Sequence, residues 1–95
     1  MLSEDIEIRN GDSHSIVLED DNSVRINKAQ DVVVGRHVWI TAHVRIMKGT
    51  IIPDNCIIAN SSVVIGKLKK TNAIYGGSPA RILKDGINWN RSRYI

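Results

Sequence analysis

The sequence has 95 residues, of which 13 are Lys or Arg and 10 are Asp or Glu, and its formal net charge at pH 7 is +3. This length allows one small domain with a marginal core, which needs support from a covalent link, a metal or a partner chain. The single cysteine, Cys56, excludes an intramolecular disulfide, and no apolar run approaches the roughly 20 residues of a membrane span. We therefore expect one cytoplasmic domain over residues 1–95, with no membrane span.

Charge is distributed unevenly along the chain. Residues 1–31 carry eight acidic and three basic residues, whereas residues 67–95 carry seven basic residues and one acidic residue. A basic end of this kind is typical of proteins that bind nucleic acid or cofactor phosphates, and also of an ordinary solvated surface. Because few aromatic residues interleave these bases and the other end is acidic, we expect no nucleic-acid partner.

The first candidate for chemistry is the sequence GDSHSI at residues 11–16. A neutral imidazole is a competent general base at pH 7, so His14 is the candidate base. Asp12 lies two residues earlier and shares a face with His14 if the segment is extended, so Asp12 either orients His14 or binds an acceptor. The plain alternative is that His14 only bridges the domain to a neighbouring chain.

Residues 17–31 are predicted to form a hairpin or loop that leaves the main fold. A polar turn around residues 20–23 is flanked by two short runs, Ile16-Val17-Leu18 and Val24-Arg25-Ile26. Two such runs separated by a polar turn are typical of a β-hairpin.

A six-residue repeat organises residues 32–67. From Val32 the chain reads VVVGRH, VWITAH, VRIMKG, TIIPDN, CIIANS and SVVIGK. The third place of each hexad is Val or Ile and the first is small or β-branched, so both face the same side of a strand. Turn-tolerant residues collect at the fourth to sixth places. Short strands joined by turns at this period predict a parallel β-helix, with Cys56 as a small buried core residue.

The second place of each hexad faces outward and is apolar in five of the six hexads. These residues are Val33, Trp39, Arg45, Ile51, Ile57 and Val63. A solvated strand alternates apolar and polar residues, so we expect the tail or neighbouring chains to cover the outer faces. A ring of three chains fits a triangular coil.

The last expected element is a short helix over residues 78–86. Ser78 is a favoured N-cap, Pro79 suits the first helical position, and Gly86 follows the end. This helix is expected to cover the C-terminal end of the β-helix, where backbone groups would otherwise be unpaired.

Three stretches, GDSHSI, INKAQDVVVGRHVWI and GGSPARILKDGINW, resemble the hexapeptide-repeat O-acetyltransferases. This group includes maltose and galactoside acetyltransferases and enzymes that modify capsular polysaccharide or lipopolysaccharide. The resemblance covers residues 6–89 and implies a left-handed parallel β-helix whose triangular coils each contain three hexads. It also implies a homotrimer with active sites in the clefts between subunits.

The resemblance further implies direct transfer of an acetyl group from acetyl-CoA to a hydroxyl of a sugar or polysaccharide, without a metal ion. In the family a catalytic His precedes the Trp of the VWI hexad across a loop, and His14 and Trp39 match this arrangement. His14 is then the general base, with Asp12 beside it as a second catalytic residue. The implied acetyl-CoA-binding residues are Trp39, Ala42, Asn60, Ile65, Arg81 and Lys84.

Two departures from the family keep other functions open. Ile65-Gly66 stands where the family has Thr-Lys, and family members have further coils or helices before the GDSHSI region, so the chain is expected to be a short form truncated at its N-terminus. A catalytically silent scaffold or sensor is the first alternative. A trimeric zinc enzyme of the carbonic anhydrase type is the second, although His37 and His43 fall at different corners of one coil.

Overall fold

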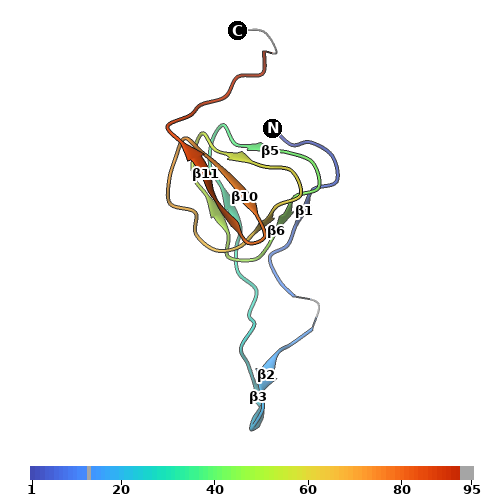
Figure 1. Ribbon diagram of the computed structural model, residues 1–95. Coiled ribbons are helices and arrows are strands. Elements are labelled where there is room, and N and C mark those ends of the chain that lie inside the picture. The colour runs from blue at the N-terminus through green and yellow to red at the C-terminus, as the bar shows by residue number, and fades with distance from the viewer. Residues whose placement is uncertain (13, 93–95) are drawn as a thin grey trace.

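The computed structural model describes residues 1–12 and 14–92, and these residues form strands and turns but no helix (Figure 1). The all-β class predicted from the repeat is confirmed. Within the described ranges there is accordingly no helix able to cross a membrane. The strands are β1 (Glu7–Ile8), β2 (Val17–Leu18), β3 (Asp21–Arg25), β4 (Val33–Val34), β5 (Trp39–Ile40), β6 (Arg45–Ile46), β7 (Ile51–Ile52), β8 (Ile57–Ile58), β9 (Val63–Val64), β10 (Ala73–Gly77) and β11 (Ala80–Asp85).

Parallel pairing between strands 18 residues apart builds a coil with three sides. The first side contains β4 and β7, the second contains β5, β8, β10 and β11, and the third contains β1, β6 and β9. On these three sides Val33 pairs with Ile51, Trp39 with Ile57, and Arg45 with Val63. The register confirms the prediction that three hexads complete one coil.

The sixth place of the hexads turns the chain at the corners of the coil. Positive φ angles between 54° and 74° occur at His37, His43, Gly49, Asn55 and Ser61. This left-handed region is rarely adopted by residues that carry a Cβ atom, and Gly and Asn enter it at low cost. At one corner His37 Nδ1 lies 3.1 Å from Asn55 Oδ1, so equivalent residues stack from coil to coil.

The core is built from the first and third places of the repeat, as predicted. At the third place Ile40, Ile46, Ile52, Ile58 and Val64 are at most 1% exposed, and Cys56 at a first place is fully buried. Val34 is the exception among the third places, because it is 40% exposed. Among the described strands its strand β4 pairs with β7 alone, because the chain leaves the coil after β1 and returns at β4.

The chain between β1 and β4 forms a hairpin that projects away from the coil (Figure 1). Strands β2 and β3 pair in antiparallel fashion, with Val17 opposite Arg25 and Leu18 opposite Asp21. The C-terminal segment leaves the coil at the opposite end, and with the hairpin it gives the molecule an elongated shape of 58 × 24 × 20 Å along its principal axes (Figure 1).

The predicted helix over residues 78–86 is wrong, because this segment is a strand. Strands β10 and β11 form an antiparallel hairpin in which Gly77 lies opposite Ala80, with Ser78 and Pro79 in the turn. Strand β10 also pairs with β8, so the hairpin widens the second side of the coil. Local helix signals such as an N-cap and a following Pro are weak, and pairing with β10 overrides them here.

Tyr75 on β10 closes the end of the coil that the helix was expected to cover. Its side chain is 3% exposed and belongs to the core. The Tyr75 hydroxyl accepts a hydrogen bond from Lys70 N at 2.9 Å and donates one to Lys70 O at 3.1 Å. Burial raises the pKa of Tyr75 above its ordinary value, so the hydroxyl stays neutral and able to donate.

Candidate active site

His14, the candidate base, lies at the base of the hairpin. Here the outgoing chain runs beside the returning chain, and two backbone hydrogen bonds of 2.8 Å join them, from Gln30 N to Asn10 O and from Ile26 N to Ile16 O. His14 is exposed to solvent. His14 is therefore accessible, on a segment that is tied back to the body of the protein.

Asp12 is held by an ion pair with the coil. Lys48 lies at the corner between the third and first sides, and its Nζ is 2.8 Å from Asp12 Oδ2 and 3.0 Å from Lys28 O. The hydrogen bonds from Lys48 and from the Asn27 amide hold the pKa of Asp12 below its ordinary value of 3.8. Asp12 is thus a carboxylate at neutral pH, and its charge is engaged by Lys48.

Asn27 joins the parts of this site, and its side chain is buried. Its Oδ1 accepts hydrogen bonds from Ile16 N at 2.6 Å and from Arg25 Nε at 3.1 Å. Its Nδ2 donates to Asp12 Oδ2 at 3.0 Å and to His14 O at 2.7 Å. The amide therefore contacts the outgoing segment at three alternate residues.

The sequence alone did not identify Asn27 or Lys48. They lie 15 and 36 residues from Asp12, and only the folding of the hairpin back onto the coil brings the three together. The sequence marks Asn27 only as a polar residue that follows Val24-Arg25-Ile26. Between the two predicted catalytic side chains, Asp12 and His14, the described residues show no hydrogen bond, because the Asp12 carboxylate is bound by Lys48 and Asn27.

A second group of predicted site residues lies on the second side of the coil. Pairing places Trp39 beside Ile57, Ile57 beside Ile74, and Ile74 beside Lys84, so these four residues form one row across β5, β8, β10 and β11. The row spans roughly 14 Å, three strand spacings. Its first three members are half-buried and apolar, and it ends in an exposed ammonium group.

A register shift in β11 places Arg81 on the same face as Lys84. Without it, residues three apart on a strand would point to opposite faces. The shift falls between Ile74 and Tyr75, so Arg81 pairs with Gly76 while Lys84 pairs with Ile74. The two basic residues were expected on a helix, and the structure instead brings them together at the edge of a sheet.

Trp89 extends this row at the Trp39 end. The two indole rings lie 5.8 Å apart and are tilted by 46°, and Trp89 also stacks on His37 with ring centroids 3.9 Å apart. A cavity of about 450 Å³ borders both tryptophans and Met1. Its other lining residues are Asn90, Arg91 and Ser92, so the cavity has an apolar wall on one part and polar residues on the other. Trp39 Nε1 is buried away from the surface, and the described residues offer it no hydrogen-bond partner.

The remaining residues that were predicted to bind acetyl-CoA, the acetyl donor, lie at two corners of the coil. Ala42 and Asn60 lie at the corner between the second and third sides, where Ser61 N donates to Ala42 O at 3.1 Å. Asn60 is exposed, and its Oδ1 accepts from Ser61 Oγ at 2.9 Å. Ile65 is exposed at a different corner, between the third and first sides, which is the corner of Lys48.

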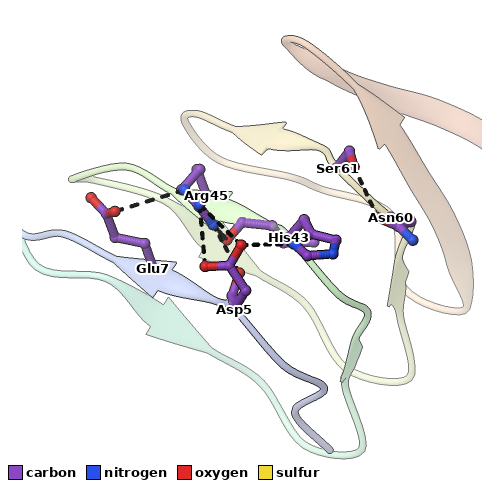
Figure 2. A network of polar contacts seen from close by, with 7 residues as sticks. Asp5, Glu7, His43, Arg45, Asn60 and Ser61 are labelled. Atoms are coloured by element: carbon purple, nitrogen blue, oxygen red, sulfur yellow. Dashed lines mark hydrogen bonds and ion pairs between the residues drawn. The ribbon is translucent and has the colours of Figure 1, made fainter.

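An exposed polar network ties the N-terminal segment to the coil near the corner that contains His43. Figure 2 shows Asp5 pointing toward His43 and Arg45, with Glu7 on the far side of Arg45. Asp5 Oδ2 lies 2.7 Å from His43 Nδ1, and Arg45 Nη1 donates to Asp5 O at 2.8 Å. The hydrogen bonds from His43 and, at 3.3 Å, from Arg45 Nη2 to the Asp5 carboxyl hold its pKa below the ordinary value, and the bond from His43 contributes most.

The sequence and fold of this chain are similar to those of known enzymes. No protein-family model matches the sequence. The polysialic acid O-acetyltransferase of Neisseria meningitidis is 42% identical over 94 residues, which cover 99% of this chain and 43% of that protein. A solved polysialic acid O-acetyltransferase matches with a TM-score of 0.88 at 42% identity, over 94% of this chain and 42% of the other. The relatives of this chain are O-acetyltransferases.

The resemblance to hexapeptide-repeat O-acetyltransferases is thereby confirmed. A maltose O-acetyltransferase from Clostridium difficile 630 also matches, with a TM-score of 0.69 at 28% identity, over 94% of this chain and 46% of that chain. This chain spans less than half the length of each of these O-acetyltransferases.

The two groups of site residues lie on different parts of the coil. Lys48, which binds Asp12, is at the corner between the third and first sides, whereas the row from Trp39 to Lys84 crosses the second side. In a coil of three sides, that corner lies opposite the second side. Within residues 1–12 and 14–92, His14 and the row therefore lie on different parts of the surface.

Proposed function

We propose that this chain carries the donor-binding surface and the general base of an O-acetyltransferase, which moves an acetyl group from acetyl-CoA to a hydroxyl of a sugar or polysaccharide. The observation that carries the proposal is the row from Trp39 to Lys84, in a chain 42% identical to a polysialic acid O-acetyltransferase. The reaction requires a surface for an extended thioester and a base for the hydroxyl, and both have candidates here.

The donor surface is argued from the chemistry of the row. Acetyl-CoA has an extended arm that ends in a nucleotide with several phosphates. The half-buried side chains of Trp39, Ile57 and Ile74 offer apolar contact to the arm. Lys84 and Arg81 at the far edge offer charged donors to phosphate oxygens. Ala42 and Asn60 flank this side at the adjoining corner.

His14 is the proposed base for the acceptor. It takes the proton of the acceptor hydroxyl while the hydroxyl oxygen attacks the thioester carbonyl carbon and a C–O bond forms. The tetrahedral oxyanion collapses, the C–S bond breaks, and the leaving thiolate takes the proton back from the imidazolium. Base catalysis of this kind contributes about 10²–10⁴ in rate, and backbone N–H groups at a coil corner are suited to stabilise the oxyanion.

Asp12 is assigned a supporting part in this mechanism. Its carboxylate binds Lys48 and Asn27, so it anchors the segment that carries His14 to the coil. A hydrogen bond from the imidazole to Asp12 is not needed for this role.

We infer a homotrimer of left-handed β-helices, as in the family that the chain resembles. In this chain the segment that carries His14 is tied to the corner of Lys48 and Ile65, opposite the row from Trp39 to Lys84. If the second side of one chain faces this corner of the next, the base and the donor meet in a cleft between two copies. A closed ring of three repeats this contact without leaving a free surface.

The acceptor is proposed to be a carbohydrate. Relatives that match nearly all of this chain act, by their names, on polysialic acid and on maltose. One coil segment is thus shared by enzymes with different acceptors, which favours a donor-binding role for it. We propose that the reaction takes place in the cytoplasm, where acetyl-CoA is available.

Two measurements on the chain test this function. Calorimetric titration with acetyl-CoA at low salt is expected to give saturable binding at about one site per chain, and release of the CoA thiol is expected to depend on added polysialic acid or maltose. Absence of acetyl-CoA binding by a folded trimer would favour the catalytically silent scaffold instead.

A further inference from the structure

We propose that Asn27 is a positioning residue that fixes the backbone of His14 for proton transfer. This inference rests on the proposed function of His14 as the general base. Asn27 lies in the returning chain of the hairpin, outside both groups of residues that the sequence indicated.

The Asn27 side chain is saturated with hydrogen bonds. An amide side chain offers two N–H donors and two acceptor positions, and Asn27 uses all four. It is also 6% exposed, while its neighbours in the returning chain from Asp21 to Ile26 are all exposed. A buried amide with every group paired has one allowed orientation, because rotating it would leave buried polar atoms without partners.

These hydrogen bonds bracket His14. Nδ2 donates to the carbonyl of His14 itself, and Oδ1 accepts from the backbone N–H of Ile16, two residues later. Nδ2 also donates to Asp12, two residues earlier. One side chain therefore holds the backbone at the His14 carbonyl and the Ile16 N–H, and holds the Asp12 side chain on the other side of His14.

Lys48 connects this arrangement to the rigid coil. It binds Asp12 Oδ2 and the carbonyl of Lys28, which follows Asn27. The outgoing and returning chains are thus both fixed to one corner. A general base must be placed within fractions of an ångström of its proton, and a misplacement of about 1 Å costs roughly 100-fold in rate.

The first test uses the unmodified chain. We expect ¹⁵N relaxation to give backbone order parameters of about 0.85 at His14 and Ile16, as in the coil strands. Values below about 0.6 at both amides would overturn the proposal, because Asn27 would then not be holding this segment.

The second test compares Asn27→Asp with Asn22→Asp, a matched change at an exposed position of β3. Asn27→Asp keeps the acceptor for Ile16 but replaces the donor to His14 by a carboxylate oxygen. We expect kcat to fall about 10- to 100-fold, with the Kd and binding stoichiometry for acetyl-CoA unchanged. Asn22→Asp is expected to retain the kcat of the parent chain.

Three outcomes separate the possible failures. If stoichiometry falls in proportion to kcat, Asn27 acts only on stability, and the positioning role is overturned. The positioning role is also overturned if Asn27→Asp keeps full kcat while His14→Ala is inactive. In that case the proposed role of His14 as the general base still stands. Full activity of His14→Ala would instead contradict the proposed function itself.

Discussion

Trp39 and Lys84 lie at the two ends of one cross-strand row, although Trp39 belongs to the regular repeat and Lys84 to the strand that follows it. Ile57 and Ile74 fill the row between them. The row depends on β11 being a strand, since a helix over these residues would not place Lys84 in register with Ile74. It gives the second side of the coil an apolar centre and a basic edge.

The basic edge predicts a salt-dependent contribution to donor binding. Lys84→Ala is expected to raise the Kd for acetyl-CoA about five- to tenfold at low salt, because it removes a charged donor to phosphate. The effect should shrink as salt is added. Lys28→Ala removes an equivalent exposed charge from the hairpin and serves as the control; equal effects of both variants would show that only net charge matters.

The inward places of the repeat predict a sharp contrast in stability. Val64 and Val34 occupy the same place of their hexads, but Val64 is fully buried and Val34 is 40% exposed. Val64→Ala is expected to lower the free energy of unfolding by about 2 kcal/mol, whereas Val34→Ala should cost about 0.5 kcal/mol or less. Denaturant unfolding of the two variants measures the difference, and similar losses would contradict the assigned core.

Closure of the coil end by Tyr75 predicts the effect of removing one oxygen atom. Tyr75→Phe keeps the buried ring but deprives both Lys70 N and Lys70 O of their partner. We expect a loss of about 1–2 kcal/mol in unfolding free energy with no change in far-ultraviolet circular dichroism. A variant as stable as the parent would mean that water replaces the hydroxyl, and that these bonds do not secure the cap.

The pKa of Asp5 predicts how acid acts on the N-terminal segment. Because folding lowers this pKa below 3.8, the ionised form stabilises the fold; the contribution is complete well above pH 3.8 and is lost as the pH falls through the folded-state value. Asp5→Asn should therefore lower the melting temperature at pH 7, and the gap to the parent should narrow as the pH falls below 3.8. Asp20→Asn, at the exposed hairpin tip, is the control, and a gap that did not change with pH would contradict the role of Asp5.

The regular coil was predictable because a period-six pattern reports directly on which side chains face inward. The positions of Ile40, Ile46 and Ile52 in the core follow from spacing alone. The exposure of Val34 was not predictable in this way, because it depends on where the chain leaves the coil. The strand at β11 was missed because Ser78 and Pro79 carry local helix signals, whereas its pairing with β10 is a tertiary effect.

The candidate site was predictable only in its separate parts. His14 and Asp12 stood out by residue type, whereas Trp39 was indicated as a site residue only by the resemblance to the O-acetyltransferases. Their surroundings depend on contacts between distant segments, such as the ion pair between Asp12 and Lys48. A register shift, not a residue type, places Arg81 and Lys84 on one face, and no pattern in the sequence reports it.

The central claim is that this chain uses His14 to transfer acetyl groups, and one comparison tests it most directly. Transfer from labelled acetyl-CoA to polysialic acid is measured for the parent chain and for His14→Ala, with acetyl-CoA affinity and trimer state determined on the same samples. We predict that transfer falls about 10²–10⁴-fold while affinity and assembly are unchanged. Transfer by His14→Ala at the rate of the parent chain would contradict the account.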